Sequence, residues 1–327
     1  MSDAIWLTEQ DVVGLMDLKD AIGALERALV LEAAGEAANM TKTLLQYGTS
    51  NLHAIGAKLG DLVGTKTWAH TGGGTSPLLM LWDANNGSLV AVIEAFAMGN
   101  MRTGGISGVA ADWMAGEIVP VMGLVGTGKQ ALSQVGAMLA VRDIGRLQVY
   151  SPRPESCSAF ADKARAEFGI EVVEAASVAA ACAGAGIVTL VTRATTPCLD
   201  AAMLEPGTHL NAVGAIAPDR EEFAQDVFDR VGRIAVDNLP GVQQLSREFM
   251  TRFDARGWDA VRPLSALIAT GTRREAREDL SLFKAMGMGI SDLAMGTELV
   301  RRARASGAGR VIPQPRKEKP RVSRRSH

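Results

Sequence analysis

The stretch that most constrains the fold is the glycine-containing turn at Gly126 to Gly128, in the segment GLVGTGKQA. An apolar run typical of a buried strand, IVPVMGLVG, precedes it, and apolar residues at helical spacing follow from Lys129 to Val141. A strand, a glycine turn and a helix in this order place backbone N–H groups where they can receive a pyrophosphate. The pattern Gly-x-Gly-x-x-Ala is short, so a plain tight turn without a ligand is the alternative.

The rhythm around this turn predicts a doubly wound parallel sheet. From about residue 116, apolar runs alternate with helical patterns, and further strands are expected at RLQVYS, IEVV, GIVTLVT, HLNAVG and RIAVDN. Helices are expected between several of them, for example over residues 155–168 and 219–229. A last helix, over about residues 291–305, lies beyond this module and is free to return to an earlier part of the chain.

The first hundred residues follow a different pattern. TEQD at Thr8 to Asp11 resembles a helix capping box. Apolar runs closed by Gly or Asn turns, such as LVGTKTWAH and PLLMLWDANNG, indicate strands. We therefore expect an antiparallel sheet flanked by helices, and an α/β protein overall.

Composition and charge narrow the class of protein. The net charge is −2, and the cysteines Cys157, Cys182 and Cys198 have neither zinc-site nor disulfide spacing, so we expect a cytoplasmic protein without a metal. The N-terminus lacks a leader pattern and no apolar run is long enough to cross a bilayer, so no membrane is expected as partner, and the slightly negative net charge gives no reason to expect a nucleic acid. Residues 315–327 carry six Lys or Arg against one Glu, which predicts a disordered tail, with a nucleic-acid-binding arm as the alternative.

The end of the second strand bears on the choice of cofactor. LQVYSPRPES supplies Ser151 and Arg153, with no acidic residue at the tip. A hydroxyl and a guanidinium favour a ribose 2′-phosphate, whereas an acid would bind the 2′-hydroxyl, so NADP(H) is preferred. NAD(H) stays open because Glu155 is close by in the sequence, and Arg153 can also be a solvated charge at a helix start.

Charged residues inside apolar surroundings point to a substrate site upstream. Arg102 and Thr103 sit between apolar runs in MGNMRTGGISGVAADWMA, and Lys66 interrupts the apolar strand LVGTKTWAH. A buried arginine needs a partner, and an anionic ligand is one. An internal ion pair for Arg102 and an edge position for Lys66 are the alternatives.

Over most of its length, the chain resembles a known family. GTK, LLMLWDANNGSLVAVIEA, MRTGGISGVAA, GLVGTGKQA, HLNAVGAIAPDREEF and FKAMGMGISDLA occur in this order, as in the ornithine cyclodeaminase and mu-crystallin family. The resemblance covers about residues 5–305 and implies a Rossmann-type dinucleotide domain (115–293). It also implies a discontinuous α+β domain for substrate binding and dimerisation, made of residues 1–114 with 294–312, ahead of the basic tail at 313–327.

The resemblance also implies roles for individual residues. Lys66 corresponds to a substrate-contacting lysine, which we take as catalytic, and Arg102 to a carboxylate-binding arginine. Residues expected at the cofactor are Thr103, Gly126, Thr127, Gly128, Lys129, Gln130, Ser151, Arg153, Thr192, Asn211, Ala212 and Val213. Met286 and Gly287 match the stretch that closes over the substrate.

Three positions depart from the family pattern. Ile216 in NAVGAIAPDRE stands where cyclodeaminases place a catalytic aspartate, and isoleucine cannot exchange a proton. Lys42 replaces an arginine, which keeps the charge for substrate binding and loses the bidentate fork. His53 stands at a glutamate position, where it is a candidate acid or base, or a hydrogen-bonded histidine on a half-buried strand.

These residues lead to a functional hypothesis with two alternatives. The leading one is an NAD(P)H-dependent imine reductase or amino-acid dehydrogenase that acts on a small α-imino or α-amino acid. The alternatives are a cyclodeaminase of the ornithine or lysine type with a different acid, and a nucleotide-dependent binding protein with little catalysis. A homodimer is expected in each case.

Overall fold

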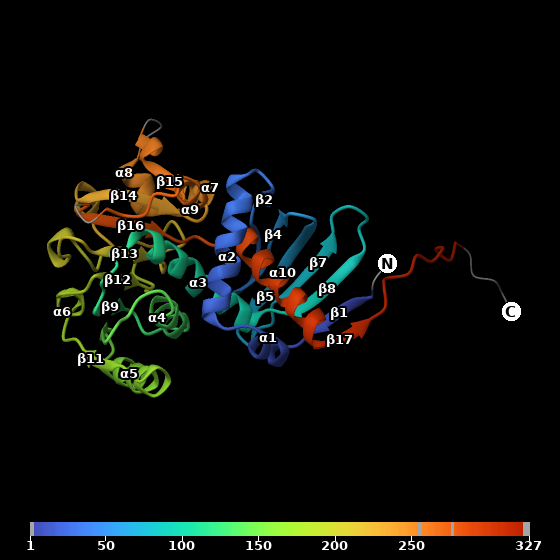
Figure 1. The fold of residues 1–327 in the computed structure, drawn as a ribbon, viewed down its shortest axis with the longest axis horizontal. Coiled ribbons are helices and arrows are strands. Elements are labelled where there is room, and N and C mark those ends of the chain that lie inside the picture. The colour runs from blue at the N-terminus through green and yellow to red at the C-terminus, as the bar shows by residue number, and fades with distance from the viewer. Residues whose placement is uncertain (1–2, 254–256, 276–277, 323–327) are drawn as a thin grey trace.

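The structure, a computed structural model, describes residues 3–253, 257–275 and 278–322. Within these residues the chain forms two β-sheets that lie side by side, with α2 (Leu18–Ala33) and α3 (Phe96–Met114) between them. The helix α10 (Gly289–Ser306) comes from the end of the chain and packs on the first sheet and on α2 (Figure 1).

The first sheet has nine strands in the described part of the chain and is antiparallel except for the pair β1–β8. Its main path runs β17 (Arg310–Ile312), β1 (Ala4–Leu7), β8 (Leu89–Glu94), β7 (Leu78–Asp83), β5 (Leu62–Thr71), β4 (Ser50–Leu59), β2 (Ala37–Asn39). β3 (Thr43–Tyr47) pairs with β4, and β6 (Gly74–Thr75) pairs with β5. The antiparallel sheet expected for the first hundred residues is thereby confirmed.

The second sheet is parallel throughout the described residues, which confirms the predicted doubly wound module. Its order is β11 (Glu171–Glu174), β10 (Arg146–Tyr150), β9 (Val121–Val125), β12 (Ile187–Leu190), β13 (His209–Ala212), β16 (Leu280–Lys284), β14 (Val231–Val236), β15 (Val261–Pro263). The remaining helices are α1 (Glu9–Leu15), α4 (Ala131–Leu139), α5 (Pro154–Phe168), α6 (Val178–Cys182), α7 (Leu239–Leu245), α8 (Arg247–Arg252) and α9 (Leu264–Ala269).

Local signals account for several element boundaries. Thr8 and Asp11 form the expected capping box at the start of α1, each side chain accepting from the other residue's backbone N–H. In the turn between β7 and β8, Asp83 Oδ1 accepts from the N–H groups of Asn85 and Asn86, and Gly87 adopts a φ of 71°. These short-range contacts need only neighbouring residues, so the sequence predicts them correctly.

The prediction of a helix over residues 219–229 is wrong for the first half of that range. Only Gln225–Asp229 forms a short 3-10 helix, and Leu199 pairs with Phe223 as an isolated parallel bridge. The Glu222 side chain is fully buried and accepts hydrogen bonds from the backbone of a neighbouring loop at Thr192. This tertiary contact overrides the helical pattern of the segment.

The small residues of α3 allow it to pack tightly on both sides. A Cβ atom at Gly104 would come within 2.5 Å of the Ser133 carbonyl oxygen on α4. At Gly105 it would come within 2.7 Å of a Leu25 methyl group on α2. The run Gly104-Gly105 therefore lets α3 pack closely against α4 on one side and α2 on the other.

The chain returns from the parallel sheet to the first sheet after β16. α10 begins at Gly289, two residues before the start of the helix expected over about residues 291–305. A Cβ atom at Gly289 would lie 2.0 Å from the Gly56 carbonyl oxygen, so helix and strand backbones are in direct contact there. This contact fixes the first turn of α10 over β4.

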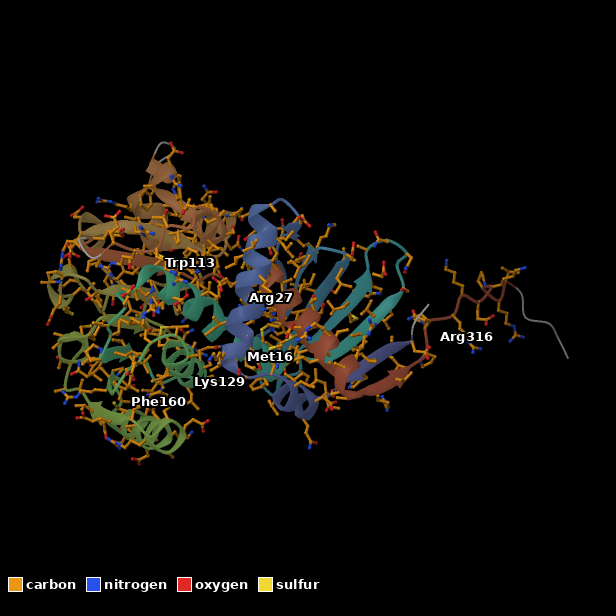
Figure 2. The ribbon with its side chains drawn as sticks, in the orientation of Figure 1. Met16, Arg27, Trp113, Lys129, Phe160 and Arg316 are labelled. Atoms are coloured by element: carbon orange, nitrogen blue, oxygen red, sulfur yellow. The ribbon has the colours of Figure 1, made fainter. Side chains whose placement is uncertain are left out.

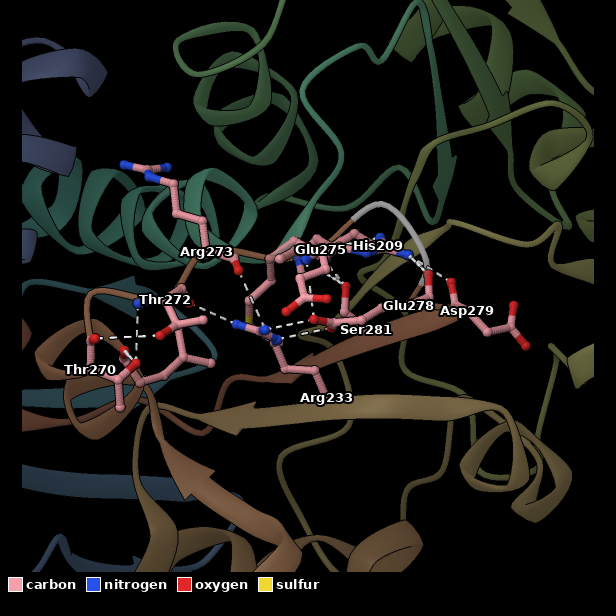
Figure 3. Close-up of polar contacts among 12 residues, drawn as sticks. His209, Arg233, Thr270, Thr272, Arg273, Glu275, Glu278, Asp279 and Ser281 are labelled. Atoms are coloured by element: carbon pink, nitrogen blue, oxygen red, sulfur yellow. Dashed lines mark hydrogen bonds and ion pairs between the residues drawn. The ribbon is translucent and has the colours of Figure 1, made fainter.

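Polar side chains join the segments at the amino ends of the parallel strands (Figure 3). Arg233 on β14 donates to both carboxylate oxygens of Glu278, and His209 Nδ1 lies 2.9 Å from Ser281 Oγ. Burial lowers the pKa of His209 to about 3, so its imidazole is neutral. Ligands of parallel sheets bind at the opposite, carboxyl edge, so this cluster is structural.

The C-terminal segment is tied to the first sheet slightly beyond β17. Gln314 accepts from Leu89 N–H and donates to the Leu89 carbonyl, and the chain that follows to Val322 is exposed and without helix or strand. It extends away from the body of the protein, as the position of Arg316 shows (Figure 2). Among the described helices, none is long and apolar enough to cross a membrane.

Candidate active site

Three charged side chains from distant segments meet between the two sheets. Lys66 from β5 donates to Asp292 Oδ1 in the first turn of α10, and Arg102 Nε from α3 lies 3.3 Å from the same oxygen. Lys66 is 4% exposed and Asp292 is 1% exposed. Two atoms of the cluster, Asp292 Oδ2 and Arg102 Nε, have no hydrogen-bond partner in the described structure. The first can accept a further hydrogen bond and the second can donate one.

Burial sets the protonation of Lys66. Burial has the largest effect and, together with the Arg102 and Lys42 charges, lowers the pKa of Lys66 to about 8, although Asp292 acts in the opposite direction. An amine with a pKa near the working pH can both donate and accept a proton. The internal ion pair that was an alternative for Arg102 is present, but it involves Asp292 together with Lys66.

Lys42 and His53 lie on the β3–β4 side of this cluster. The His53 ring stacks on Trp68, with centroids 4.7 Å apart and planes 11° apart, and Lys66 Nζ lies 5.3 Å from the centroid of the Trp68 ring. Desolvation and the Lys42 charge lower the pKa of His53, and its Nδ1 has no partner in the described structure. Lys42 keeps an exposed surface, while surrounding protein atoms and the Arg102 charge lower its pKa.

The segment at Met286 and Gly287 packs against the guanidinium group of Arg102. Both backbone N–H groups donate to the buried Asp237 carboxylate at 2.8 Å, and Asn238 donates to the Gly287 carbonyl. Gly287 has a φ of 84°, and a Cβ atom there would lie 3.0 Å from an Arg102 guanidinium nitrogen. Burial raises the pKa of Asp237 above its usual value, and the hydrogen bonds from Met286 and Gly287 and the Arg102 charge offset only part of this effect.

The glycine turn meets the geometric requirements of a phosphate-binding turn. Gly126 has a φ of 105°, and a Cβ atom there would lie 2.6 Å from the Val191 carbonyl oxygen. At Gly128 a Cβ atom would meet nothing within 4 Å, so this side of the turn is open. Gln130 at the start of α4 makes no side-chain cap hydrogen bond, and Lys129 is exposed, which leaves the helix N-terminus available to an anion.

The turn also lies at the expected place in the sheet. It follows β9, between β10 and β12, where the order of the parallel strands reverses. Figure 2 places Lys129 near the junction of the two halves of the molecule. Gln134 on α4 donates to the Thr103 carbonyl, next to Arg102, so the same stretch of α3 borders both the turn and the charged cluster.

The other residues expected at the cofactor occupy more varied positions. Ser151 is buried at the end of β10, and Arg153 is exposed at the start of α5. The Thr103 hydroxyl donates within α3 to the Gly99 carbonyl. Thr192 follows β12 and donates from both its N–H and its hydroxyl to Glu222 Oε1.

The residues at the end of β13 and just after it are buried. The Asn211 side chain points into the core, with Oδ1 3.1 Å from His209 Nε2 and Nδ2 3.5 Å from Met138 Sδ. Ala212 and Val213 are buried as well. Ile216 beyond them is 42% exposed, which leaves an apolar side chain on the surface of this loop.

The acidic residues of the site were not predicted from the sequence. Asp292, Asp237 and Glu222 carry the hydrogen bonds described above, and none was singled out. Asp292 had a usable signal, since it is a single charge in the apolar run MGMGISDLAMG at a helix start. Its partner Lys66 is 226 residues away in the chain, and no local pattern joins the two.

Comparisons with known proteins identify the family of the chain. Residues 2–307 match the model of the ornithine cyclodeaminase/mu-crystallin family, and the chain belongs to that family. It is 27% identical to an alanine dehydrogenase of Archaeoglobus fulgidus over 95% of this chain and 98% of the relative. It is also 27% identical to a delta(1)-pyrroline-2-carboxylate reductase of Bacillus cereus over 83% of this chain and 84% of that protein.

A solved structure supports the same assignment. An archaeal alanine dehydrogenase dimer with bound NAD has a TM-score of 0.86 and 27% identity, covering 95% of this chain and 99% of that one. In the described part of the present chain, no group of three or more His, Cys, Asp or Glu side chains is arranged to hold a metal ion.

The role of Asp292 in setting the charge of Lys66 can be tested directly. We expect Asp292→Asn to lower the pKa of Lys66 below about 8, because it removes the carboxylate that favours the ammonium form. The pKa is measured from the ¹³Cε shift of Lys66 in protein labelled at lysine, with Lys66→Arg identifying the resonance. Asp83→Asn, in the β7–β8 turn, is the matched control, and equal Lys66 pKa values in the two variants would contradict the assignment.

Proposed function

We propose that the protein is an NAD(P)H-dependent oxidoreductase that reduces a small α-imino acid, or oxidises the corresponding α-amino acid. The observation that carries the proposal is the buried cluster of Lys66, Arg102 and Asp292 beside a glycine turn that fits a dinucleotide. The relatives named alanine dehydrogenase and delta(1)-pyrroline-2-carboxylate reductase support the same class of reaction on C–N bonds.

The cations of the site suit a substrate carboxylate. Three cations, Lys42, Lys66 and Arg102, lie near two carboxylates, Asp292 and Asp237, and the Arg102 and Lys42 charges lower the pKa of Lys66. The remaining positive potential attracts an anion. Arg102, held between Asp292 and the Gly287 backbone, is the proposed carboxylate ligand, with Lys42 as a second cation at the more exposed side.

Lys66 is the proposed proton donor. A bound nicotinamide supplies the hydride for the substrate carbon. The Lys66 ammonium gives a proton to the imine nitrogen, and the neutral amine that results keeps its hydrogen bond to Asp292. His53, with a free Nδ1 and a lowered pKa, is a second candidate for the same proton.

A cyclodeaminase is disfavoured by the loop after β13. That reaction needs a group that manages a second substrate nitrogen, and the residue presented there is Ile216. An exposed aliphatic side chain fits a substrate whose side chain is small or apolar.

For the cofactor, we propose a preference for NADP(H). Arg153 is exposed at the N-terminus of α5 and Ser151 lies at the end of β10, a pair that suits a 2′-phosphate. Glu155 is also exposed in the first turn of α5 and is the feature that would favour NAD(H), which the archaeal alanine dehydrogenase structure contains.

We also propose that the protein is a homodimer, formed through β3 and the adjacent edge of the first sheet. Large apolar side chains that are at least two-fifths exposed gather there: Met40, Leu44, Leu45, Tyr47 and Leu52. Exposed apolar patches of this kind on a sheet edge are typical of protein interfaces. Leu44 pairs across the strands with His53, so the proposed interface borders the active site.

The reaction is tested by oxidation of NADPH and NADH against cyclic α-imino acids and against 2-oxo acids with ammonia. We expect Lys66→Ala to lower kcat by about 10²-fold or more without weakening dinucleotide binding, because it removes the proton donor. Arg102→Ala should raise the substrate KM by about 10-fold or more through the lost charged hydrogen bonds.

Reduction should slow as pH rises through about 8, where Lys66 loses its proton. The exposed Lys58→Ala is the control, and full activity of Lys66→Ala would rule out its role.

Cofactor preference is tested by Arg153→Ala. Loss of the guanidinium should raise KM for NADPH by about tenfold and leave KM for NADH nearly unchanged, because only NADPH carries the 2′-phosphate. Lys163→Ala removes the same charge farther along α5 and should change neither value. An equal effect of Arg153→Ala on both cofactors would argue against the preference.

The dimer is tested by sedimentation equilibrium. We expect a mass close to twice the 34.4 kDa of the chain, and a monomer for Leu45→Glu, because a buried unpaired carboxylate opposes association. Val13→Glu, at an exposed apolar position on α1, should remain dimeric. A monomeric wild-type protein would refute the proposed interface.

A further inference from the structure

A further buried carboxylate, outside the charged cluster, joins two loops at the carboxyl edge of the parallel sheet. Glu222 is fully buried, and each of its side-chain oxygens accepts two hydrogen bonds. Oε1 accepts from Thr192 N at 2.7 Å and from Thr192 Oγ1 at 2.8 Å. Oε2 accepts from Gly214 N at 2.8 Å and from Ala215 N at 3.0 Å. Glu222 thus links the residue after β12 to those after β13.

The two loops are packed directly against each other at this point. A Cβ atom at Gly214 would lie 2.2 Å from the Thr192 carbonyl oxygen and 2.4 Å from Glu222 Oε1. Only glycine fits there without displacing the loop. The carboxylate therefore fixes the spacing of the two loops as well as their hydrogen bonds.

Glu222 is itself held by a second buried group. Its backbone N–H donates to Glu248 Oε1 at 3.1 Å. Glu248 and Lys284 are both fully buried and 3.5 Å apart, and Ser246 Oγ donates to the other Glu248 oxygen at 2.8 Å. Because the backbone of Glu222 is anchored, its side chain is directed toward Thr192 and Gly214.

The location of these loops points to one end of the cofactor. Thr192 lies against the glycine turn, since a Cβ atom at Gly126 would come within 3.3 Å of its methyl carbon. β12 and β13 lie on one side of β9, and β10, with Ser151 and Arg153 at its end, lies on the other. In a doubly wound sheet the two halves of a dinucleotide bind on these two sides. The loops joined by Glu222 therefore face the nicotinamide half.

We propose that Glu222 is a positioning residue for the nicotinamide half of the cofactor, an inference that rests on the proposed NAD(P)H-dependent function. It acts through the backbone of Thr192, Gly214 and Ala215, which it holds at the carboxyl ends of β12 and β13. All four of its partners donate hydrogen bonds, so the position requires an acceptor at both side-chain oxygens. Glutamine has the same shape, but its NH₂ group would face N–H donors and leave them unpaired.

The test compares Glu222→Gln with its neighbour Glu221→Gln, whose carboxylate pairs at 3.6 Å with Arg247 and makes none of these four bonds. Binding of NADPH, NADH and adenosine 5′-monophosphate to the full-length protein is measured by titration calorimetry, and the fold is checked by far-UV circular dichroism. We expect Glu222→Gln to weaken binding of both dinucleotides by about tenfold or more, and to leave binding of the monophosphate within about twofold of wild type. Glu221→Gln should bind all three ligands like the wild type.

Each other outcome has a defined meaning. If Glu222→Gln binds the dinucleotides normally, or loses the monophosphate to the same extent, the assignment is overturned. If the variant does not fold, Thr192→Val replaces it: loss of one donor should weaken dinucleotide binding by about threefold, and no change overturns the assignment. A wild-type protein that binds dinucleotide but reduces no imino acid contradicts the proposed reaction and leaves the role of Glu222 standing. A wild-type protein that binds no dinucleotide overturns both.

Discussion

The ion pair between Lys66 and Asp292 is the interaction on which the active-site region depends. Removing two charges from water is costly, and a pair of this kind persists only where the surrounding structure brings the partners together. Here β5 supplies the lysine and α10, more than two hundred residues later, supplies the carboxylate. The backbone contact between Gly289 and Gly56 lets α10 come close enough. The site therefore exists only once the end of the chain has packed on the first sheet.

α3 connects this pair to the dinucleotide module. Arg102 on this helix reaches Asp292, while the next residues, Thr103 and Gly104, contact α4 immediately after the glycine turn. A single helix thus sets the distance between the cationic cluster and the glycine turn. Reacting groups must be positioned to within a few tenths of an ångström. Because both regions contact one helix, that helix keeps them aligned.

Much of the fold could be predicted from the sequence, and the reasons are local. The alternation of strands and helices, the capping box at Thr8 and the turn at Gly87 depend on neighbouring residues. The family resemblance also indicated Lys66, Arg102 and the glycine turn as candidate site residues. The helix expected over residues 219–229 failed because its pattern is helical while Glu222 is drawn inward by backbone donors from other loops.

By itself, the sequence determined the class of fold, the position of the glycine turn and the cationic residues that suit an anionic substrate. These follow from periodicity, glycine placement and residue chemistry, which neighbouring positions carry. The tertiary structure decided which acids accompany those residues: Asp292 with Lys66, Asp237 with the Gly287 segment, and Glu222 with Thr192 and Gly214. Each of these contacts joins segments that only folding brings together, and the protonation of Lys66 depends on burial that no linear pattern encodes.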